Sequence, residues 1–220
     1  MNPLELEQYL LLKKETNEYS NKHATPQMVV AKQLLYIEEY SKTIPIGCVM
    51  DHRKLNKKYP TFKNLRYKRT TEDIIDLSIL ASEALKQMHQ NQNIHTDLHA
   101  GNFGITKEKD ICIFDCDGCY IGKKNNIAKK ASTIKFYESF GLDSDTIEYD
   151  KYSFTMMLLQ ILSNYYISET NPKNIHSAIS NLKINNDALK NYFQILLNPT
   201  IDQGYTGDFF KKLKKVYTSS

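Results

Sequence analysis

The 220-residue sequence contains no long apolar segment. Its longest apolar run, FTMMLLQIL, has nine residues and is too short to cross a bilayer. The N-terminus, MNPLELEQYL, has no basic start followed by an apolar core, which argues against a signal peptide. No internal repeat or low-complexity linker interrupts the chain. These absences predict a soluble, cytoplasmic protein that does not associate with membranes.

Cysteine is also scarce, and three of the four cysteines fall within the stretch CIFDCDGC. Neither their spacing nor a second group of His and Cys residues resembles a structural zinc site. Nothing in the pattern indicates disulfides, so a reducing compartment is favoured. Cys112 should lie on a strand, and we predict buried, reduced thiols. The full set is Cys48, Cys112, Cys116 and Cys119.

Neither sign of charge is in large excess. The chain has 29 basic and 25 acidic residues, a net charge of +4, which suits a phosphorylated ligand but does not imply a nucleic-acid partner. Its short lysine runs are expected to be solvated. The length allows one large domain or two small ones with a substantial core, and it leaves the oligomeric state open.

Hydrophobic spacing predicts the main elements. Residues 3–23 are polar and rich in Leu, Glu and Lys, as in an exposed helix. KQLLYIEEY and IPIGCVMDH predict two strands joined by the turn SKT. A helix should begin after Thr70 and Thr71, where Glu72 and Asp73 suit the positive end of its dipole. Its apolar face would consist of Ile74, Leu77, Ala81, Ala84, Leu85 and Met88.

Two polar motifs follow this helix. The first, HTDLHAGN, and the second, FDCDG, stand on either side of a predicted hairpin, NFGIT and ICIFD around the turn KEKD. Such a hairpin would bring Asn102, at its start, beside Asp115, at its end. A second helix, buried on most sides, should begin at Asp150. Smaller helices are expected after it, separated by turns at TNPKN and NPTIDQG.

The residue types in the two motifs suit phosphoryl transfer. A carboxylate and an amide oxygen are typical ligands of Mg²⁺, which completes its shell with water and phosphate oxygens. Asp97 would lie nearby and accept a proton from an attacking hydroxyl. The structural alternative is two polar turns that cap a hairpin, since Asp, Asn and Gly are common in turns.

The motifs resemble those of the protein-kinase-like superfamily. HTDLHAGN is similar to the catalytic loop H-R-D-L-x-x-x-N, and DCD is similar to the start of the D-F-G element. IPIGCVMDH looks like the strand that leads to the hinge, and YDKYSFTMMLLQIL looks like the central helix of the C-lobe. The resemblance covers roughly residues 30–165, with several motifs in the family's order.

This resemblance implies a role for each matching residue. Asp97 would be the catalytic base, Asn102 and Asp115 would bind Mg²⁺, and Asp150 would hydrogen-bond the backbone of the catalytic loop. ATP would be the phosphoryl donor. Its adenine would lie near the end of the hinge strand, at Cys48, Met50 and Asp51.

The sequence departs from the family pattern at four places. Thr96 replaces the Arg that pairs with a phosphorylated activation loop. His99 stands where typical eukaryotic protein kinases have Lys, as in bacterial and small-molecule kinases, and could contact the γ-phosphate. Asp117 replaces the Gly of D-F-G and could be a further metal ligand. A Gly-rich loop and a phosphate-pairing Lys are not found, since Lys32 lies too close to the next strand.

The histidines outside position 99 receive structural interpretations. His95 is expected to be packed and hydrogen-bonded so that it holds the loop, with no part in the chemistry. No partner can be identified from the sequence for the remaining four, which we predict to be surface or core-edge residues. These four are His23, His52, His89 and His176.

Together these observations predict an α+β protein with a protein-kinase-like fold. Residues 1–52 would form an incomplete, β-rich N-lobe that starts after the missing phosphate-binding parts, and residues 53–220 a mainly α-helical C-lobe. The predicted function is ATP- and Mg²⁺-dependent transfer of a phosphoryl group to a hydroxyl, most simply a Ser/Thr hydroxyl of a protein. The alternatives are a small-molecule hydroxyl kinase and a non-catalytic pseudokinase or remnant that binds a partner protein.

Overall fold

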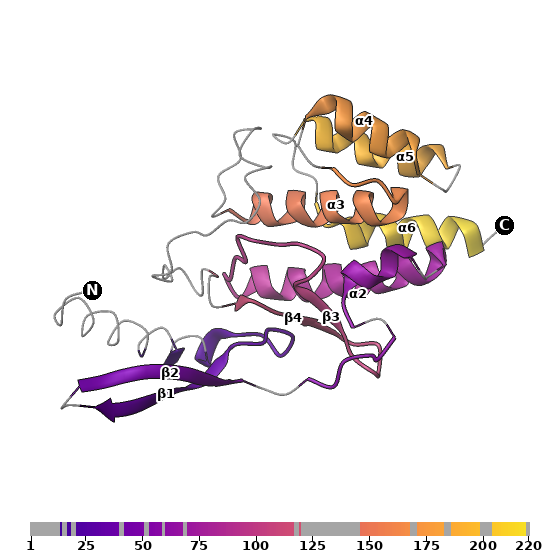
Figure 1. Cartoon of the computed structure of the whole chain (residues 1–220). Coiled ribbons are helices and arrows are strands. Elements are labelled where there is room, and N and C mark those ends of the chain that lie inside the picture. Colours follow the sequence, from indigo (N-terminus) through magenta and orange to yellow (C-terminus); the bar gives the residue numbers. More distant parts are fainter. Residues whose placement is uncertain are drawn as a thin grey trace.

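The computed structural model describes 14, 17–18, 21–39, 42–50, 53–58, 60–67, 70–116, 119, 146–167, 171–182, 186–198 and 204–218. Within these residues the chain is a mixture of helices and short antiparallel sheets, as predicted for an α+β protein. In Figure 1, β1 and β2 lie at one end of the molecule and α4 and α5 at the other. The helices α2, α3 and α6 lie between them.

The two strands predicted near the N-terminus are confirmed. β1 (Ala31–Glu39) pairs with β2 (Lys42–Met50) in an antiparallel ladder that runs from the pair Ala31 and Met50 to the pair Glu39 and Lys42. The predicted turn SKT is shorter than expected, because Lys42 and Thr43 already belong to the ladder. Of the helix predicted at 3–23, residues 14, 17–18 and 21–23 are helical and the rest lies outside the described residues.

The first long helix forms where the sequence predicted it. α2 (Thr71–Gln90) follows a 3-10 helix, η1 (Phe62–Tyr67), and its N-cap is Thr70. The Thr70 hydroxyl accepts a hydrogen bond from the Asp73 amide at 3.1 Å, so one of the exposed donors of the first turn is satisfied. All six apolar positions predicted to share one face are buried. This face packs against α3, α6 and β4.

The predicted hairpin is present and is covered along both edges. β3 (Phe103–Ile105) pairs with β4 (Ile111–Ile113), and every residue of the two strands is buried. On the β4 side, Val29 donates to the Ile113 carbonyl at 2.8 Å. On the β3 side, the Ile105 amide donates to the Pro60 carbonyl at 3.0 Å. Pairing on both edges leaves little freedom for the hairpin to shift.

The central helix begins earlier than predicted. α3 (Ile147–Ser163) has Thr146 as its N-cap, with the Thr146 hydroxyl accepting from the Tyr149 amide at 3.2 Å. Asp150 therefore lies in the first turn of the helix and not at its start, because the capping hydroxyl precedes it by four positions. The helix is buried around most of its circumference, as expected.

The remaining helices complete the core. They are α4 (Pro172–Ser180), α5 (Asp187–Phe193), the 3-10 helix η4 (Gln194–Leu197) and α6 (Thr206–Thr218). α6 approaches α2 closely at Gly207, whose amide donates to the Ser82 hydroxyl at 2.9 Å. A Cβ at Gly207 would lie 2.6 Å from the Cβ of Ser82, so only Gly permits this approach. Among the described residues, every helix is too short or too polar to cross a membrane.

Candidate active site

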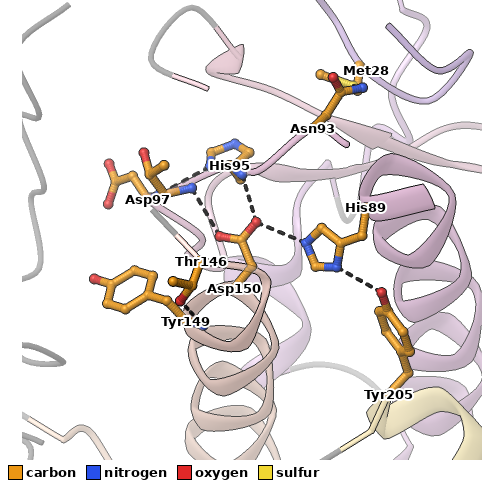
Figure 2. Close-up of polar contacts among 10 residues, drawn as sticks. Met28, His89, Asn93, His95, Asp97, Thr146, Tyr149, Asp150 and Tyr205 are labelled. Carbon is orange, nitrogen blue, oxygen red and sulfur yellow. Dashed lines mark hydrogen bonds and ion pairs between the residues drawn. The ribbon is translucent and has the colours of Figure 1, made fainter. Parts of the chain in front are cut away.

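The backbone of the first polar motif is held by a buried carboxylate. Asp150, which has no exposed surface, accepts hydrogen bonds from the amide of His95 at 2.6 Å and from the amide of Thr96 at 3.0 Å (Figure 2). Its carboxylate also contacts Nε2 of His89 at 3.0 Å. The resemblance implied that Asp150 would support the catalytic loop in this way, and these contacts confirm it.

The hydrogen bonds to Asp150 hold an unfavourable conformation in place. Thr96 has φ 70°, in the left-handed region that a β-branched residue rarely adopts. Such a conformation costs on the order of 1–3 kcal/mol and persists only where the surrounding contacts determine it. The Asp150 carboxylate supplies such contacts, because it binds the N–H groups of the two consecutive peptides on either side of His95, the second of which leads into Thr96. The chain is thereby turned immediately before Asp97.

His95 connects the two polar motifs. Its side chain is 1% exposed, and Nε2 contacts the Phe114 carbonyl oxygen at 2.8 Å. A carbonyl only accepts, so Nε2 carries a proton and donates it. Nδ1 accepts a longer hydrogen bond, 3.4 Å, from the Asp97 amide. The predicted structural role of His95 agrees with these contacts.

Asp97 and Asn102 are tied together across the tight turn between them. The amide Nδ2 of Asn102 donates to the backbone carbonyl of Asp97 at 3.0 Å. The amide of Asn102 donates to the His99 carbonyl at 3.0 Å, which closes the turn. Asn102 is buried next to Phe103, whose ring packs between Phe62 and Phe154 at centroid distances of 5.6 and 5.3 Å. The loop therefore rests on the aromatic core beneath β3.

Asp115 is brought to the same place by the hairpin. The Phe114 amide donates to the Asn102 carbonyl at 2.8 Å, so the residue after Phe114 lies beside the first motif. Asp115 has φ 58°, a second non-glycine residue in the left-handed region, and its side chain is exposed. The structure thus brings Asn102 and Asp115 together as the predicted hairpin required.

His99 is close enough to the acidic residues of both motifs for their charges to act on it. Burial lowers its pKa below the usual 6.5, an effect that the charges of Asp97 and Asp115 oppose and that His95 and Lys63 reinforce. Nδ1 accepts from the Gly101 amide at 3.0 Å. A neutral ring therefore carries its proton on Nε2. At pH 7 His99 offers a hydrogen-bond donor to a ligand and not the fixed positive charge of a lysine.

Gly101 is required for this position of the imidazole. A Cβ at residue 101 would lie 2.9 Å from Cε1 of His99 and 3.0 Å from its Nδ1, closer than atoms normally approach. The absence of a side chain lets the ring lie against the backbone and accept its hydrogen bond.

The oxygen atoms in this region suit a hard divalent cation. The Nδ2 group of Asn102 is used by the Asp97 carbonyl, which leaves Oδ1 as the ligand atom of that amide. Asp115 adds an exposed carboxylate. An amide oxygen and a carboxylate form a small, all-oxygen set of the kind that Mg²⁺ uses when phosphate and water supply the other ligands.

The other predicted ligand residues are placed less fully. Met50 is the last residue of β2, and its side chain is 45% exposed. Cys48 pairs with Leu34 in the β1–β2 ladder. Asp51 and Asp117 lie outside the described residues. The adenine contacts and the third metal ligand therefore stay predictions.

A pocket of about 600 Å³ lies elsewhere, between the outer face of α2 and the turn of the β3–β4 hairpin. Charged residues of both signs line it, among them Arg53, Lys54, Glu83 and Glu108. None of the predicted catalytic or metal-binding residues belongs to its lining.

The comparison with protein families agrees with the site. The family profile of the ABC1 atypical kinase-like domain matches residues 37–150, just over half of the chain. The chain belongs to the ABC1 atypical kinase-like family. No curated protein matches its sequence. The matched region runs from β1 to Asp150 and so contains both polar motifs and the hairpin between them.

Membership of the ABC1 kinase-like family confirms the predicted relationship to the protein-kinase-like superfamily. At this level the protein is a kinase-like phosphotransferase, for which ATP and metal use are expected in general. The contacts of Asp150 and His95 give the family assignment a physical basis in this chain.

Sequence reasoning missed His89, predicted to be a surface or core-edge residue without a partner. In this ABC1 kinase-like chain it is buried, with Nε2 on Asp150 and Nδ1 3.0 Å from the Tyr205 hydroxyl (Figure 2). The periodicity of α2 contained the signal, because residue 89 follows Leu85 by four positions and so shares its buried face. Its contact with Tyr205 could not be predicted, since that residue is far away in the sequence.

Lys63 was also missed. It lies in η1, and its backbone amide donates to the Ala100 carbonyl at 3.0 Å. Burial is the largest cause of the lowered pKa of His99, and the positive charge of Lys63 makes a smaller contribution in the same direction. No pattern in the sequence distinguishes this lysine from the others of the Lys-rich segment. The structure places its backbone next to the first polar motif.

Proposed function

We propose that the protein transfers the γ-phosphoryl group of ATP to a hydroxyl group, with Asp97 as the catalytic base. One observation carries the proposal, namely that residues of both motifs are held around Asp97. Asp150 binds the backbone amides before Asp97, and Asn102 binds the backbone carbonyl of Asp97. The charges of Asp97 and Asp115 both act on His99. Residues from two separate motifs are thus fixed around one position.

In the proposed reaction each residue has a separate task. Asp97 accepts the proton of the attacking hydroxyl as its oxygen bonds to the γ-phosphorus and the bond to the leaving ADP oxygen breaks. Asn102 Oδ1 and the Asp115 carboxylate hold Mg²⁺, with Asp117 as a further candidate ligand. When bound, the ion neutralises charge on the phosphates.

Two nitrogen-bearing side chains suit the transferred phosphate. The Nε2–H of neutral His99 donates a hydrogen bond to a phosphate oxygen. Lys63 supplies positive charge from η1, a place outside the usual kinase motifs. Electrostatic stabilisation by such groups is often the largest single contribution to catalysis. Lys63 thereby supplies the positive charge that neutral His99 does not.

We further propose the finer assignments that the sequence suggested. Residues 1–52 form a β-rich N-lobe that ends at the hinge, and residues 53–220 form the helical C-lobe. The adenine lies against the end of β2, at Cys48, Met50 and Asp51. The acceptor is a Ser/Thr hydroxyl of a protein, with a small-molecule hydroxyl as the variant. The family match and the two-strand ladder ending at Met50 support this arrangement.

The experiment is a transfer assay with labelled ATP and Mg²⁺, offered both Ser/Thr peptides and a panel of sugars and alcohols. Asp97→Asn should lower transfer by about a hundredfold or more while nucleotide binding is kept, since a positioned base contributes 10²–10⁴-fold. Asp115→Asn should lower both transfer and the Mg²⁺ dependence of nucleotide binding. Asp110→Asn, in the exposed hairpin turn, is the matched control and should behave as the wild type.

Two results would change the assignment. Transfer that survives both Asp97→Asn and Asp115→Asn would refute the proposed roles. Binding of ATP without any transfer by the wild type would favour the non-catalytic alternative, in which the chain acts as a partner-binding module. Label in the Ser/Thr peptides would identify a protein acceptor, and label in the sugars or alcohols would identify a small-molecule acceptor.

A further inference from the structure

Three metal-ligating side chains, from the two polar motifs and the residue that follows the second, lie close together. One ring nitrogen of His95 and the Sγ atoms of Cys116 and Cys119 all lie within 4.8 Å of one another. The exposed fractions of these residues are 1%, 2% and 0%. None of the three is among the residues proposed above to bind Mg²⁺ or to take part in phosphoryl transfer.

The local backbone explains why the two thiols converge. The Cys119 amide donates to the Cys116 carbonyl at 3.3 Å, which holds the two residues close together. Two residues separate the cysteines, the Cys-x-x-Cys spacing found in zinc sites. Cys116 itself is held by its thiol, which lies 3.4 Å from the Ile113 carbonyl at the end of β4.

The environment of His95 is the one expected of a metal ligand. Nε2 donates to the Phe114 carbonyl at 2.8 Å, which fixes the tautomer and leaves the lone pair on Nδ1. Metal-binding histidines almost always donate their other N–H to a carbonyl, a carboxylate or water. As long as this bond is kept, Nδ1 is the nitrogen available to a cation, and it would give up its long contact with the Asp97 amide.

We propose that His95, Cys116 and Cys119 bind a zinc ion. Sulfur and imidazole ligands select Zn²⁺ over Mg²⁺, which prefers oxygen. The site is therefore distinct from the oxygen set of Asn102 and Asp115, although Cys116 directly follows Asp115 in the chain. Three protein ligands leave one tetrahedral position for water or another ligand. On binding, each thiol releases its proton to solvent and coordinates as a thiolate.

The position of the ion gives it a defined structural effect. His95 precedes Asp97 by two residues, and Cys116 directly follows Asp115. One ion would join the loop that carries the proposed base to the loop that carries the proposed Mg²⁺ ligand. Zinc would thus restrain the two motifs relative to each other, in addition to the hydrogen bond between His95 and Phe114.

The sequence alone predicts no zinc site, both from the spacing of the cysteines and from the lack of a second His/Cys group near them. The first point was wrong, because Cys116 and Cys119 form a Cys-x-x-Cys pair whose thiols lie close to a histidine. The third ligand comes from the other motif instead. The β3–β4 hairpin lies between His95 and Cys116 in the sequence, and its pairing returns the chain to the same place.

The test is a metal titration of the full chain after removal of metals with a chelator under reducing conditions. Co²⁺ is the spectroscopic probe, since its thiolate complexes show charge-transfer absorption that oxygen sites do not. We expect this absorption to appear at stoichiometric Co²⁺ and to disappear when Zn²⁺ is added. Cys116→Ser and Cys119→Ser should each weaken metal binding by at least about tenfold. Loss of a residue that only hydrogen-bonds a metal ligand already lowers affinity by about tenfold or more, and these cysteines would bind the ion directly.

Cys112→Ser is the matched control, because Cys112 is a buried cysteine of the neighbouring strand outside the cluster. Cys112→Ser should keep the absorption, and Zn²⁺ should raise the thermal midpoints of this variant and of the wild type by the same amount. Circular dichroism establishes that each variant is folded before titration.

Three outcomes would overturn the proposal. They are no thiolate absorption in the wild type, absorption that persists in the Cys116→Ser/Cys119→Ser double variant, or a disulfide between these cysteines with no metal uptake after its reduction. The readout requires neither ATP nor an acceptor. A failed titration therefore leaves the phosphotransfer proposal standing, and loss of phosphotransfer leaves the zinc proposal standing.

Discussion

Removal of the Asp150 carboxylate should destabilise the whole protein. This carboxylate accepts from the amides of His95 and Thr96 at 2.6 and 3.0 Å, and it contacts His89 Nε2 at 3.0 Å. All four residues are buried. Asp150→Ala therefore leaves three polar groups in the interior without the acceptor that they share. Asp150→Asn keeps one oxygen acceptor and should have a smaller effect.

The magnitude follows from the burial of these groups. A hydrogen bond to a charged group contributes about 1.5–3 kcal/mol, and each buried donor left without its acceptor costs about 1–3 kcal/mol. Because the contacts share one acceptor they are not additive, and we expect Asp150→Ala to lower the free energy of unfolding by about 3–5 kcal/mol. For a chain of this size the thermal midpoint should fall by about 6–20 °C.

The assay is urea and thermal denaturation followed by circular dichroism. Asp187→Ala serves as the matched control, because Asp187 is an exposed aspartate in the first turn of α5. Its interaction with the helix dipole contributes only about 0.3–1 kcal/mol. The reasoning about Asp150 would be refuted if Asp150→Ala unfolded at the same urea concentration as Asp187→Ala with an unchanged slope.

Three further predictions concern single positions. Gly104→Ala should lower the free energy of unfolding by about 1–3 kcal/mol, because a Cβ at residue 104 would overlap the Phe114 ring and lie 2.6 Å from the sulfur of Cys112. An unchanged midpoint in urea denaturation would contradict the close packing of Gly104 against these side chains. Burial raises the pKa of Cys112 to about 11, so at pH 8 its alkylation should be far slower in the folded than in the urea-unfolded protein, and equal rates would show that the thiol is accessible. Because the pKa of His99 is lowered in the folded protein, the unfolded chain binds the imidazole proton more tightly. The contribution of neutral His99 to the free energy of unfolding is therefore lost as the pH falls below 6.5. An NMR titration of the folded protein should give a midpoint below 6.5 for His99, and a midpoint above 6.5 would be inconsistent with burial.

Local patterns in the sequence were sufficient for the elements that form the frame of the site. The capping Thr70 and the apolar spacing of α2 are local signals, and both are present in the structure. The hairpin was predictable because two short apolar runs flank a polar turn. With the hairpin in place, the nearness of Asn102 and Asp115 followed from strand pairing alone.

What could not be predicted depends on contacts between distant parts of the chain. The bond between His89 and Tyr205 joins α2 to the start of α6, and no spacing rule connects them. The sequence prediction starts α3 at Asp150, three residues late, because Thr146 is followed by no distinctive apolar pattern that would mark its hydroxyl as the cap. Lys63 acquired its place through the fold of a Lys-rich segment that has no periodic pattern.

The short β3–β4 hairpin also determines where the length of this chain can change. Its strands are buried on both faces, so an insertion or deletion within them would turn side chains to the opposite face and move Asp115 away from Asn102. The turn at 107–110 is exposed throughout. Residues can be added there without altering the separation of the two motifs, which makes this turn a suitable position for a tag, a probe or a natural insertion.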